Sequence, residues 1–167
     1  MTVQKNSETG ELADAPPNRE PNPRQRILVV DDDPAIRSIN REVLTYSGYV
    51  VDAVPDGEAA WDALQLIDYD LMVTDNDMPK VTGIELIQKL QATGRAMPVI
   101  MATGASPDEE FARHQLIQPA ITLLKPYTFD ELLTAVKMVL RAASDSLGEM
   151  APPPNWPAQP PTDHSRL

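Results

Sequence analysis

The sequence predicts an α/β protein built from five βα units, in which helices cover both faces of one parallel sheet. Two observations lead to this fold class. Five short apolar runs follow one another along the chain, and the segments between them carry apolar residues at helical spacing. Strands that alternate with helices in this way are typical of a doubly wound sheet with right-handed crossovers.

The predicted strands are apolar runs with little apolar/polar alternation, the pattern of strands that are covered on both faces. Four of the five lack alternation, and the second run is broken only by Asp52. The five runs are Ile27 to Val30, Tyr49 to Val54, Leu71 to Thr74, Met97 to Ala102 and Ala120 to Leu124.

The segments between the strands are predicted to be helices. Capping-box sequences mark the starts of the last two, at residues 106–109 and 128–131, and Pro107 takes the first helical position of the earlier one. The apolar stripes are Ile36, Ile39, Val43 and Leu44; Ala59, Ala60, Ala63, Leu64 and Ile67; Ile84, Leu86, Ile87 and Leu90; a weaker set of Phe111, Leu116 and Ile117; and Leu132, Leu133, Val136, Val139 and Leu140.

Proline content indicates where the folded domain begins and ends. Ten of the 17 prolines lie in the first 25 and the last 24 residues, and both ends are poor in large apolar side chains. Such a composition cannot bury enough surface to offset the entropy of the chain. We therefore expect one domain at residues 26–143, a disordered N-terminal tail at 1–25 and a proline-rich disordered C-terminal tail at 144–167.

Charge and composition narrow the class of function. The chain has 14 basic and 25 acidic residues, a net charge of −11. This charge opposes binding to a phosphate backbone, so we expect no direct contact with nucleic acid. The absence of cysteine rules out disulfides and thiolate zinc sites. The sequence shows no signal-peptide apolar region and no apolar run of about 18 residues, so we expect a cytoplasmic protein without membrane insertion.

Polar residues follow four of the predicted strands, at the carboxyl ends that meet along one edge of a parallel sheet. Taken singly, each has an ordinary structural explanation. Asp33, which precedes Pro34, is expected to be a helix N-cap. The residues at this edge are Asp31, Asp32 and Asp33 after the first strand, Asp75 and Asp77 after the third, Thr103 after the fourth and Lys125 after the fifth.

Taken together, these residues predict a cation site. Asp31, Asp32 and Asp75 would lie at the ends of adjacent strands, where three carboxylates repel one another and raise their own pKa values. A hard divalent cation such as Mg²⁺ relieves this repulsion, because it prefers carboxylate, carbonyl and water oxygens. Lys125 adds a fixed positive charge and Thr103 a hydroxyl donor. These are the parts that phosphoryl transfer requires.

Four segments, ILVVDDDPAIR, DLMVTDNDMPKVTG, MPVIMATG and LLKPYT, match the motif regions of one known family in order. On these segments, residues 26–143 resemble the receiver domain of bacterial two-component response regulators. The resemblance implies a flavodoxin-like fold with strand order 2-1-3-4-5. It also implies a phosphorylation-dependent switch with Mg²⁺ as cofactor.

The resemblance further assigns the acceptor and the metal ligands. Asp75 would accept the phosphoryl group and contribute to the metal site. Asp31 and Asp32 would form the acidic pair, with Asp32 a direct ligand of Mg²⁺. The backbone carbonyl of Asp77 would complete the metal set.

The remaining roles also follow from the resemblance. Thr103 would bind one phosphoryl oxygen and Lys125 another, with a cis peptide bond between Lys125 and Pro126. The phosphoryl donor would be a phosphohistidine on a sensor histidine kinase or a phosphotransfer protein. The domain would take part in its own phosphorylation and dephosphorylation without being an enzyme in the usual sense.

The chain departs from the family pattern at three positions. Family members usually carry Tyr or Phe where this chain has Thr122, and Ala where it has Gly104. Asp77, two residues after the acceptor, adds a carboxylate beside the path of an attacking water. These departures affect the aromatic part of the switch, the loop after the fourth strand and the lifetime of the phosphorylated state.

Two alternatives stay open on sequence alone. The segment LMVTDNDMP resembles the strand and D-x-D of haloacid dehalogenase-type phosphohydrolases, although Pro79 and the early acidic pair depart from that pattern. A receiver-shaped adaptor that works without phosphorylation is the other. Only 26 residues follow Arg141, too few for an output module. We therefore expect output through a downstream protein target.

Overall fold

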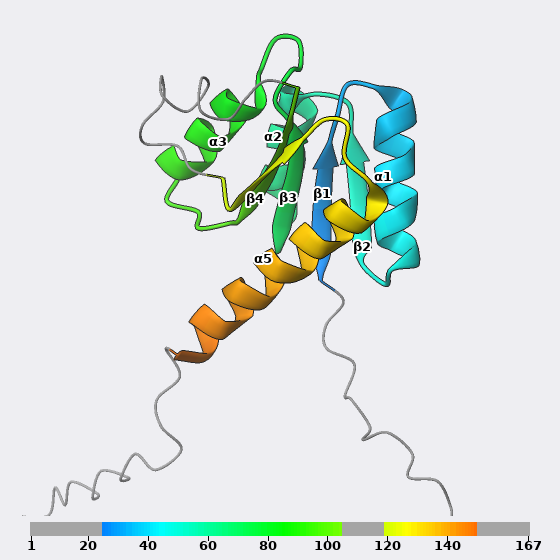
Figure 1. Ribbon diagram of the computed structural model, residues 1–167. Helices are drawn as coiled ribbons and strands as arrows, with labels where there is room; N and C mark the ends of the chain where they lie inside the picture. Colours follow the sequence, from blue (N-terminus) through cyan, green and yellow to red (C-terminus); the bar gives the residue numbers. More distant parts are fainter. Residues whose placement is uncertain (1–24, 105–118, 150–167) are drawn as a thin grey trace, which may run out of the picture.

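The computed structural model describes residues 25–104 and 119–149, which form strands and helices in alternation (Figure 1). All five predicted strands are present, and four of the predicted helices. The fourth apolar stripe and the capping box at 106–109 lie outside the described residues. The elements are β1 (Arg26–Val30), α1 (Pro34–Tyr46), β2 (Val50–Val54), α2 (Gly57–Leu66), β3 (Leu71–Asp75), α3 (Gly83–Ala92), β4 (Val99–Thr103), β5 (Ile121–Leu124) and α5 (Phe129–Glu149).

The five strands form one parallel sheet in the order β2-β1-β3-β4-β5, which confirms the predicted fold class and strand order. β1 and β3 are adjacent, with Val30 opposite Thr74, and Asp75 at the end of β3 lies opposite Ala102 of β4. Thr103 at the end of β4 lies opposite Leu124 of β5. The register therefore brings the carboxyl ends of four strands to one edge of the sheet.

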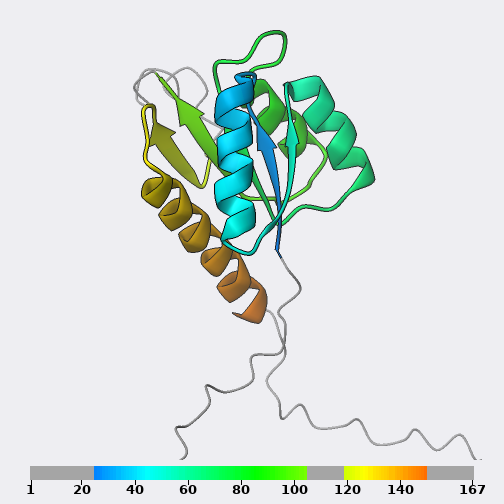
Figure 2. The ribbon, with the colours of Figure 1, turned by 90° about the vertical axis from the view of Figure 1, so that its right-hand side faces the viewer.

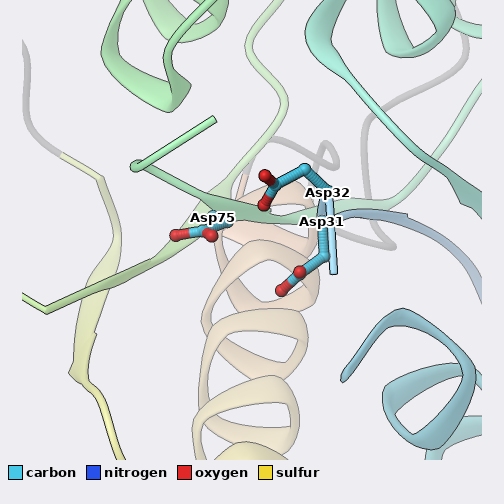
Figure 3. Close-up of side chains that lie close together, drawn as sticks. All are labelled: Asp31, Asp32 and Asp75. Atoms are coloured by element: carbon cyan, nitrogen blue, oxygen red, sulfur yellow. The ribbon is translucent and has the colours of Figure 1, made fainter. Parts of the chain in front are cut away.

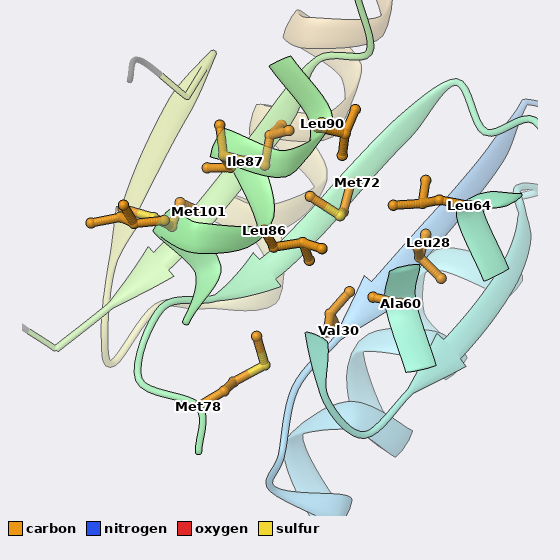
Figure 4. Packing of buried hydrophobic residues seen from close by; sticks show 12 residues of the cluster. Leu28, Val30, Ala60, Leu64, Met72, Met78, Leu86, Ile87, Leu90 and Met101 are labelled. Atoms are coloured by element: carbon orange, nitrogen blue, oxygen red, sulfur yellow. The ribbon is translucent and has the colours of Figure 1, made fainter. Parts of the chain in front are cut away.

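Helices cover both faces of the sheet, as a doubly wound fold requires. α2 and α3 pack on one face, where Leu28, Met72 and Met101 of the central strands meet them (Figure 4). α1 and α5 pack on the other face, against Ile27 and other strand residues, and an edge-on view shows α1 and α2 on opposite sides of the sheet (Figure 2). The two cores hold the strands rigidly enough to position side chains at their ends.

The start of each helix is set by a side-chain cap. Asp33 is the N-cap of α1, as predicted, and its carboxylate accepts hydrogen bonds from the backbone of Ala35 and Ile36 at 2.7 and 3.2 Å. The capping box at the start of α5 is also confirmed, since Thr128 N–H donates to Glu131 at 2.7 Å and Glu131 N–H donates to the Thr128 hydroxyl at 3.2 Å.

The apolar stripe predicted for α1 was wrong at one position. Ile39, expected in the core, is 43% exposed, and Asn40 is buried in its place at 2% exposure. Burial of an amide is tolerated when it finds a hydrogen-bond partner. The Asn40 side chain donates to the hydroxyl of Tyr127, 2.9 Å away, and so ties α1 to the segment before α5.

The predicted boundary of the C-terminal tail was also wrong. α5 continues to Glu149, six residues beyond the expected end of the domain at 143. The Ser144 hydroxyl donates back to the carbonyl of Leu140 at 3.0 Å, and that of Ser146 to the carbonyl of Ala142 at 2.9 Å. These bonds satisfy the serine hydroxyls within the helix. The first proline after the start of α5 is Pro152, so no proline interrupts the helix before Glu149.

Gly83 at the start of α3 lies against the backbone of the residue that ends β3. A Cβ placed on Gly83 would be 2.6 Å from the carbonyl oxygen of Asp75 and 3.0 Å from the Cα of Asn76. Both neighbours are backbone atoms, which cannot turn aside as a side chain would. α3 can therefore approach the site only with glycine here.

We expect Gly83→Ala to lower the free energy of unfolding by about 1–3 kcal/mol, the usual cost of overpacking. The measurement is urea-induced unfolding followed by circular dichroism. Glu85→Gln in the same turn is the control, because glutamine keeps an oxygen for the capping interaction with Thr82. A Gly83→Ala protein as stable as the control would show that the close approach is absent.

Candidate functional site

Three carboxylates meet at the carboxyl edge of the sheet, as the sequence predicted. Asp31 and Asp32 follow β1, and Asp75 ends β3 (Figure 3). One oxygen from each lies within 4.8 Å of the oxygens of the other two. Asp31 and Asp75 are only 2% and 4% exposed, whereas Asp32 is open to solvent. The site therefore combines two buried carboxylates with one that faces outward.

The three consecutive aspartates after β1 have different surroundings. Asp31 accepts a hydrogen bond at Oδ1 from the backbone of Asp33, 3.0 Å away, and Asp33 itself caps α1. Arg37, one turn into α1, donates to the backbone carbonyl of Asp31 at 2.8 Å. The chain direction is thus fixed on both sides of Asp32, which leaves its carboxylate free to face the edge of the site.

Lys125 places a cation between the two buried carboxylates. Its Nζ lies 2.7 Å from Oδ2 of Asp75 and 3.8 Å from Oδ2 of Asp31. The backbone supports this position, because Lys125 N–H donates to the Thr103 carbonyl at 2.9 Å and the peptide bond to Pro126 is cis, as the resemblance implied. One ammonium group therefore offsets part of a cluster of three carboxylates.

Burial and the neighbouring charges both shift the pKa values of Asp31 and Lys125. Burial raises the pKa of Asp31 above its usual value, and the nearby carboxylates of Asp75 and Asp32 add to the increase, against the opposing effect of Lys125. Burial alone would lower the pKa of Lys125, but the hydrogen bond to Asp75 and the attraction of Asp31 raise it. The surroundings therefore favour the charged form of Lys125 and make ionisation of Asp31 less favourable than that of an exposed aspartate.

Thr103 and Asp77 complete the predicted set. Thr103 ends β4 and is fully buried. Asp77 is exposed, and its backbone N–H donates to Oδ1 of Asp75 at 3.1 Å. The Asp77 carboxylate accepts a hydrogen bond from the backbone of Gly104 at 3.3 Å, a contact that the sequence did not suggest. The role of the Asp77 carbonyl as a metal ligand stays a prediction.

Three supporting features were missed in the sequence. The contact between buried Asn40 and half-buried Tyr127 left no readable signal, because Asn40 belongs to no motif and nothing in the segment LLKPYT points Tyr127 to a partner in α1. The capping box of Thr82 and Glu85, which starts α3, was readable from its spacing and was overlooked. Asn76, also buried, accepts a hydrogen bond from the backbone of Ile84 at 3.3 Å and so connects the end of β3 to α3.

The donor atoms at this edge fit a hard divalent cation. All are oxygens, the carboxylates are close enough to share one ion, and Lys125 alone does not balance their charge. Mg²⁺ is commonly held by one or two carboxylates together with water. Asp31, Asp32 and Asp75 are the residues that would hold it.

The structure is an α/β protein with a doubly wound parallel sheet whose carboxyl edge gathers three aspartates and one lysine. A sequence model of the response regulator receiver domain matches residues 27–137 of this chain. The chain therefore belongs to the response regulator receiver domain family. Its fold and acidic cluster are those that the sequence resemblance implied, and family membership removes the basis for the haloacid dehalogenase alternative.

Two curated relatives illustrate the similarity. Response regulator MprA of Mycolicibacterium vanbaalenii is 34% identical over 128 residues, which cover 75% of this chain and 55% of the relative. The probable transcriptional regulatory protein SilR of Salmonella typhimurium is 31% identical over 124 residues, 74% of this chain and 54% of the relative. The chain thus spans about half the length of the curated relatives it matches.

Solved structures agree with this assignment. The chemotaxis response regulator CheY4 of Vibrio cholerae shares 27% identity, with a TM-score of 0.64, and the match covers 70% of this chain and 98% of that one. The response regulator TrrA of Thermotoga maritima, solved in complex with Mg²⁺ and BeF, shares 31% identity, with a TM-score of 0.62, over 69% and 98% of the two chains.

None of the helices within residues 25–104 and 119–149 is both long and apolar enough to cross a membrane.

We expect Asp31→Asn to raise the melting temperature at pH 7 in EDTA. The pKa of Asp31 is higher in the folded chain than in the unfolded one, so its ionisation costs stability at neutral pH. That cost is absent below the unfolded pKa of about 4, so the two proteins should then melt together. Thermal unfolding at pH 7 and pH 3.5 makes the comparison.

Mg²⁺ supplies the second part of this test. It should raise the melting temperature of the wild type more than that of Asp31→Asn, because the variant has one carboxylate fewer to hold the ion. A lower melting temperature for Asp31→Asn in EDTA at pH 7 would show that the Asp31–Lys125 attraction outweighs burial.

Proposed function

We propose that Asp75 accepts a phosphoryl group from a phosphohistidine on a sensor histidine kinase or a phosphotransfer protein. The observation that carries this proposal is the position of Asp75, buried at the end of β3 and 2.7 Å from Lys125, with Asp31 and Asp32 close by. A carboxylate oxygen of Asp75 attacks phosphorus. The new P–O bond forms as the P–N bond breaks, and the electron pair returns to the histidine nitrogen.

The surrounding side chains have distinct parts in this transfer. Lys125 faces the acceptor and offsets negative charge on the incoming group. Thr103, at the end of the neighbouring strand, supplies a hydroxyl for a phosphoryl oxygen. Bound Mg²⁺ would neutralise charge on the transferring oxygens, held by Asp31, Asp32, Asp75 and the carbonyl of Asp77.

The family is a signalling family, so the output of this chain is a change of conformation and not a released product. We propose that a downstream protein reads that change. The name of SilR describes a probable transcriptional regulator. For this chain, the expectation of no direct nucleic-acid contact stays a prediction that rests on its net charge of −11. A cytoplasmic location is likewise part of the proposal.

The experiment is incubation of the full chain with acetyl phosphate and Mg²⁺, followed by intact mass measurement. We expect the wild type to gain one phosphate and Asp75→Asn to gain none. Asp33→Asn is the matched control, because it changes an aspartate at the same edge whose carboxylate caps α1, and it should label as the wild type does. Labelling in EDTA should be lost.

The other outcomes separate the alternatives. An adaptor that works without phosphorylation would gain no phosphate under any condition. A phosphohydrolase would release many equivalents of inorganic phosphate for each protein molecule. Labelling of Asp75→Asn at the wild-type level would place the acceptor elsewhere and overturn the assignment.

A further inference from the structure

Asp77 connects the acceptor aspartate to the end of the neighbouring strand. Its backbone N–H donates to Oδ1 of Asp75 at 3.1 Å, and Oδ2 of its side chain accepts from Gly104 N–H at 3.3 Å. Gly104 directly follows Thr103, the buried last residue of β4. A single residue therefore bridges Asp75 and the backbone next to Thr103.

Lys125 makes a second bridge between the Asp75 carboxylate and the end of β4. Its backbone N–H donates to the Thr103 carbonyl at 2.9 Å, and its Nζ contacts Oδ2 of Asp75 at 2.7 Å. The two bridges differ in charge, since one ends in an ammonium group and the other in a carboxylate. Phosphorylation replaces the single negative charge of the Asp75 carboxylate with about −1.5 to −2 on the acyl phosphate, and the added negative charge attracts Lys125 and repels Asp77.

We infer that the Asp77 side chain is a positioning residue that holds Gly104 N–H in the unphosphorylated chain and releases it when Asp75 is phosphorylated. The inference rests on the proposed function and adds a resting-state contact to it. Asp77 is exposed, so its side chain can turn into water without leaving a buried charge behind. Release frees the backbone donor beside Thr103 for another acceptor.

The consequence is a bias against the phosphorylated state. A ligand shifts a conformational equilibrium only by its differential affinity for the two states. The phosphoryl group must therefore supply the free energy that the Asp77–Gly104 bond contributes to the resting state. Loss of the side-chain acceptor should make phosphorylation, or binding of a phosphoryl mimic, more favourable.

The test compares Asp77→Ala with Asp77→Asn in the full chain. Both variants lack the negative charge, but only asparagine keeps a side-chain oxygen that can accept from Gly104 N–H. The probe is beryllium fluoride with Mg²⁺, and its affinity is measured by isothermal titration calorimetry. We expect Asp77→Ala to bind it about fivefold more tightly than Asp77→Asn, the factor that one typical net hydrogen bond provides.

A second readout reports the bond without any phosphoryl mimic. In nuclear magnetic resonance spectra, the Gly104 amide proton of Asp77→Asn should stay close to the wild-type shift. In Asp77→Ala it should move upfield, because the amide has lost its acceptor. Removal of charge alone would move this proton equally in both variants.

Each outcome decides the matter. Equal affinities in the two variants, or an unchanged Gly104 amide in Asp77→Ala, would overturn the inference while leaving the phosphoacceptor assignment intact. If the wild type itself failed to bind beryllium fluoride with Mg²⁺, the proposed function would fail, and the release step with it.

Discussion

The contact between Lys125 and Asp75 is the interaction on which the rest of the site depends. It places an ammonium group 2.7 Å from a carboxylate that is almost completely buried. A buried carboxylate without a partner is strongly unfavourable, so the position of Lys125 must be fixed by the fold. Lys125 lies at the end of β5, with its N–H bonded to the end of β4, and a capped helix begins four residues later at Phe129. The strand order places β5 beside β4 and β4 beside β3, and the lysine that follows β5 reaches Asp75 at the end of β3.

The same contact leaves the cluster short of positive charge, and this shortage makes the site responsive. One cation faces three carboxylates, and burial together with the neighbouring carboxylates of Asp75 and Asp32 raises the pKa of Asp31. A fully balanced pocket would gain little from a metal ion or from a change in the charge of the acceptor. Here each added charge alters the balance at the ends of β1, β3 and β4. Repulsion among the three carboxylates lowers the stability of the resting chain. A bound cation that relieves this repulsion gains the corresponding free energy.

Much of the site was predictable because it depends on strand ends. Apolar runs located the strands, and residues that directly follow a buried strand have little freedom to be elsewhere, so Asp31, Asp75 and Lys125 were found. The strand order came from resemblance, since no property of single strands encodes it. The Asn40–Tyr127 and Asp77–Gly104 contacts could not be predicted, because each joins residues far apart in the sequence through side-chain geometry, and one partner of each contact lies in a loop. The predicted tail began at residue 144, whereas α5 ends at Glu149. The prolines that mark the tail start only at Pro152, so the boundary was placed too early.

Thr122 gives these contacts more weight than they would have in a family member with a ring at that position. It is half-buried in β5 opposite Met101 of β4, and its methyl and hydroxyl offer little apolar surface to bury or expose. Polar contacts then offer a route by which a change at Asp75 can reach β4 and β5. Two of these contacts involve neighbouring backbone groups at the end of β4. Lys125 binds the carbonyl of Thr103, and Asp77 binds the N–H of Gly104. Because one is cationic and the other anionic, a single added negative charge strengthens the first and weakens the second, so both act on the end of β4 at once.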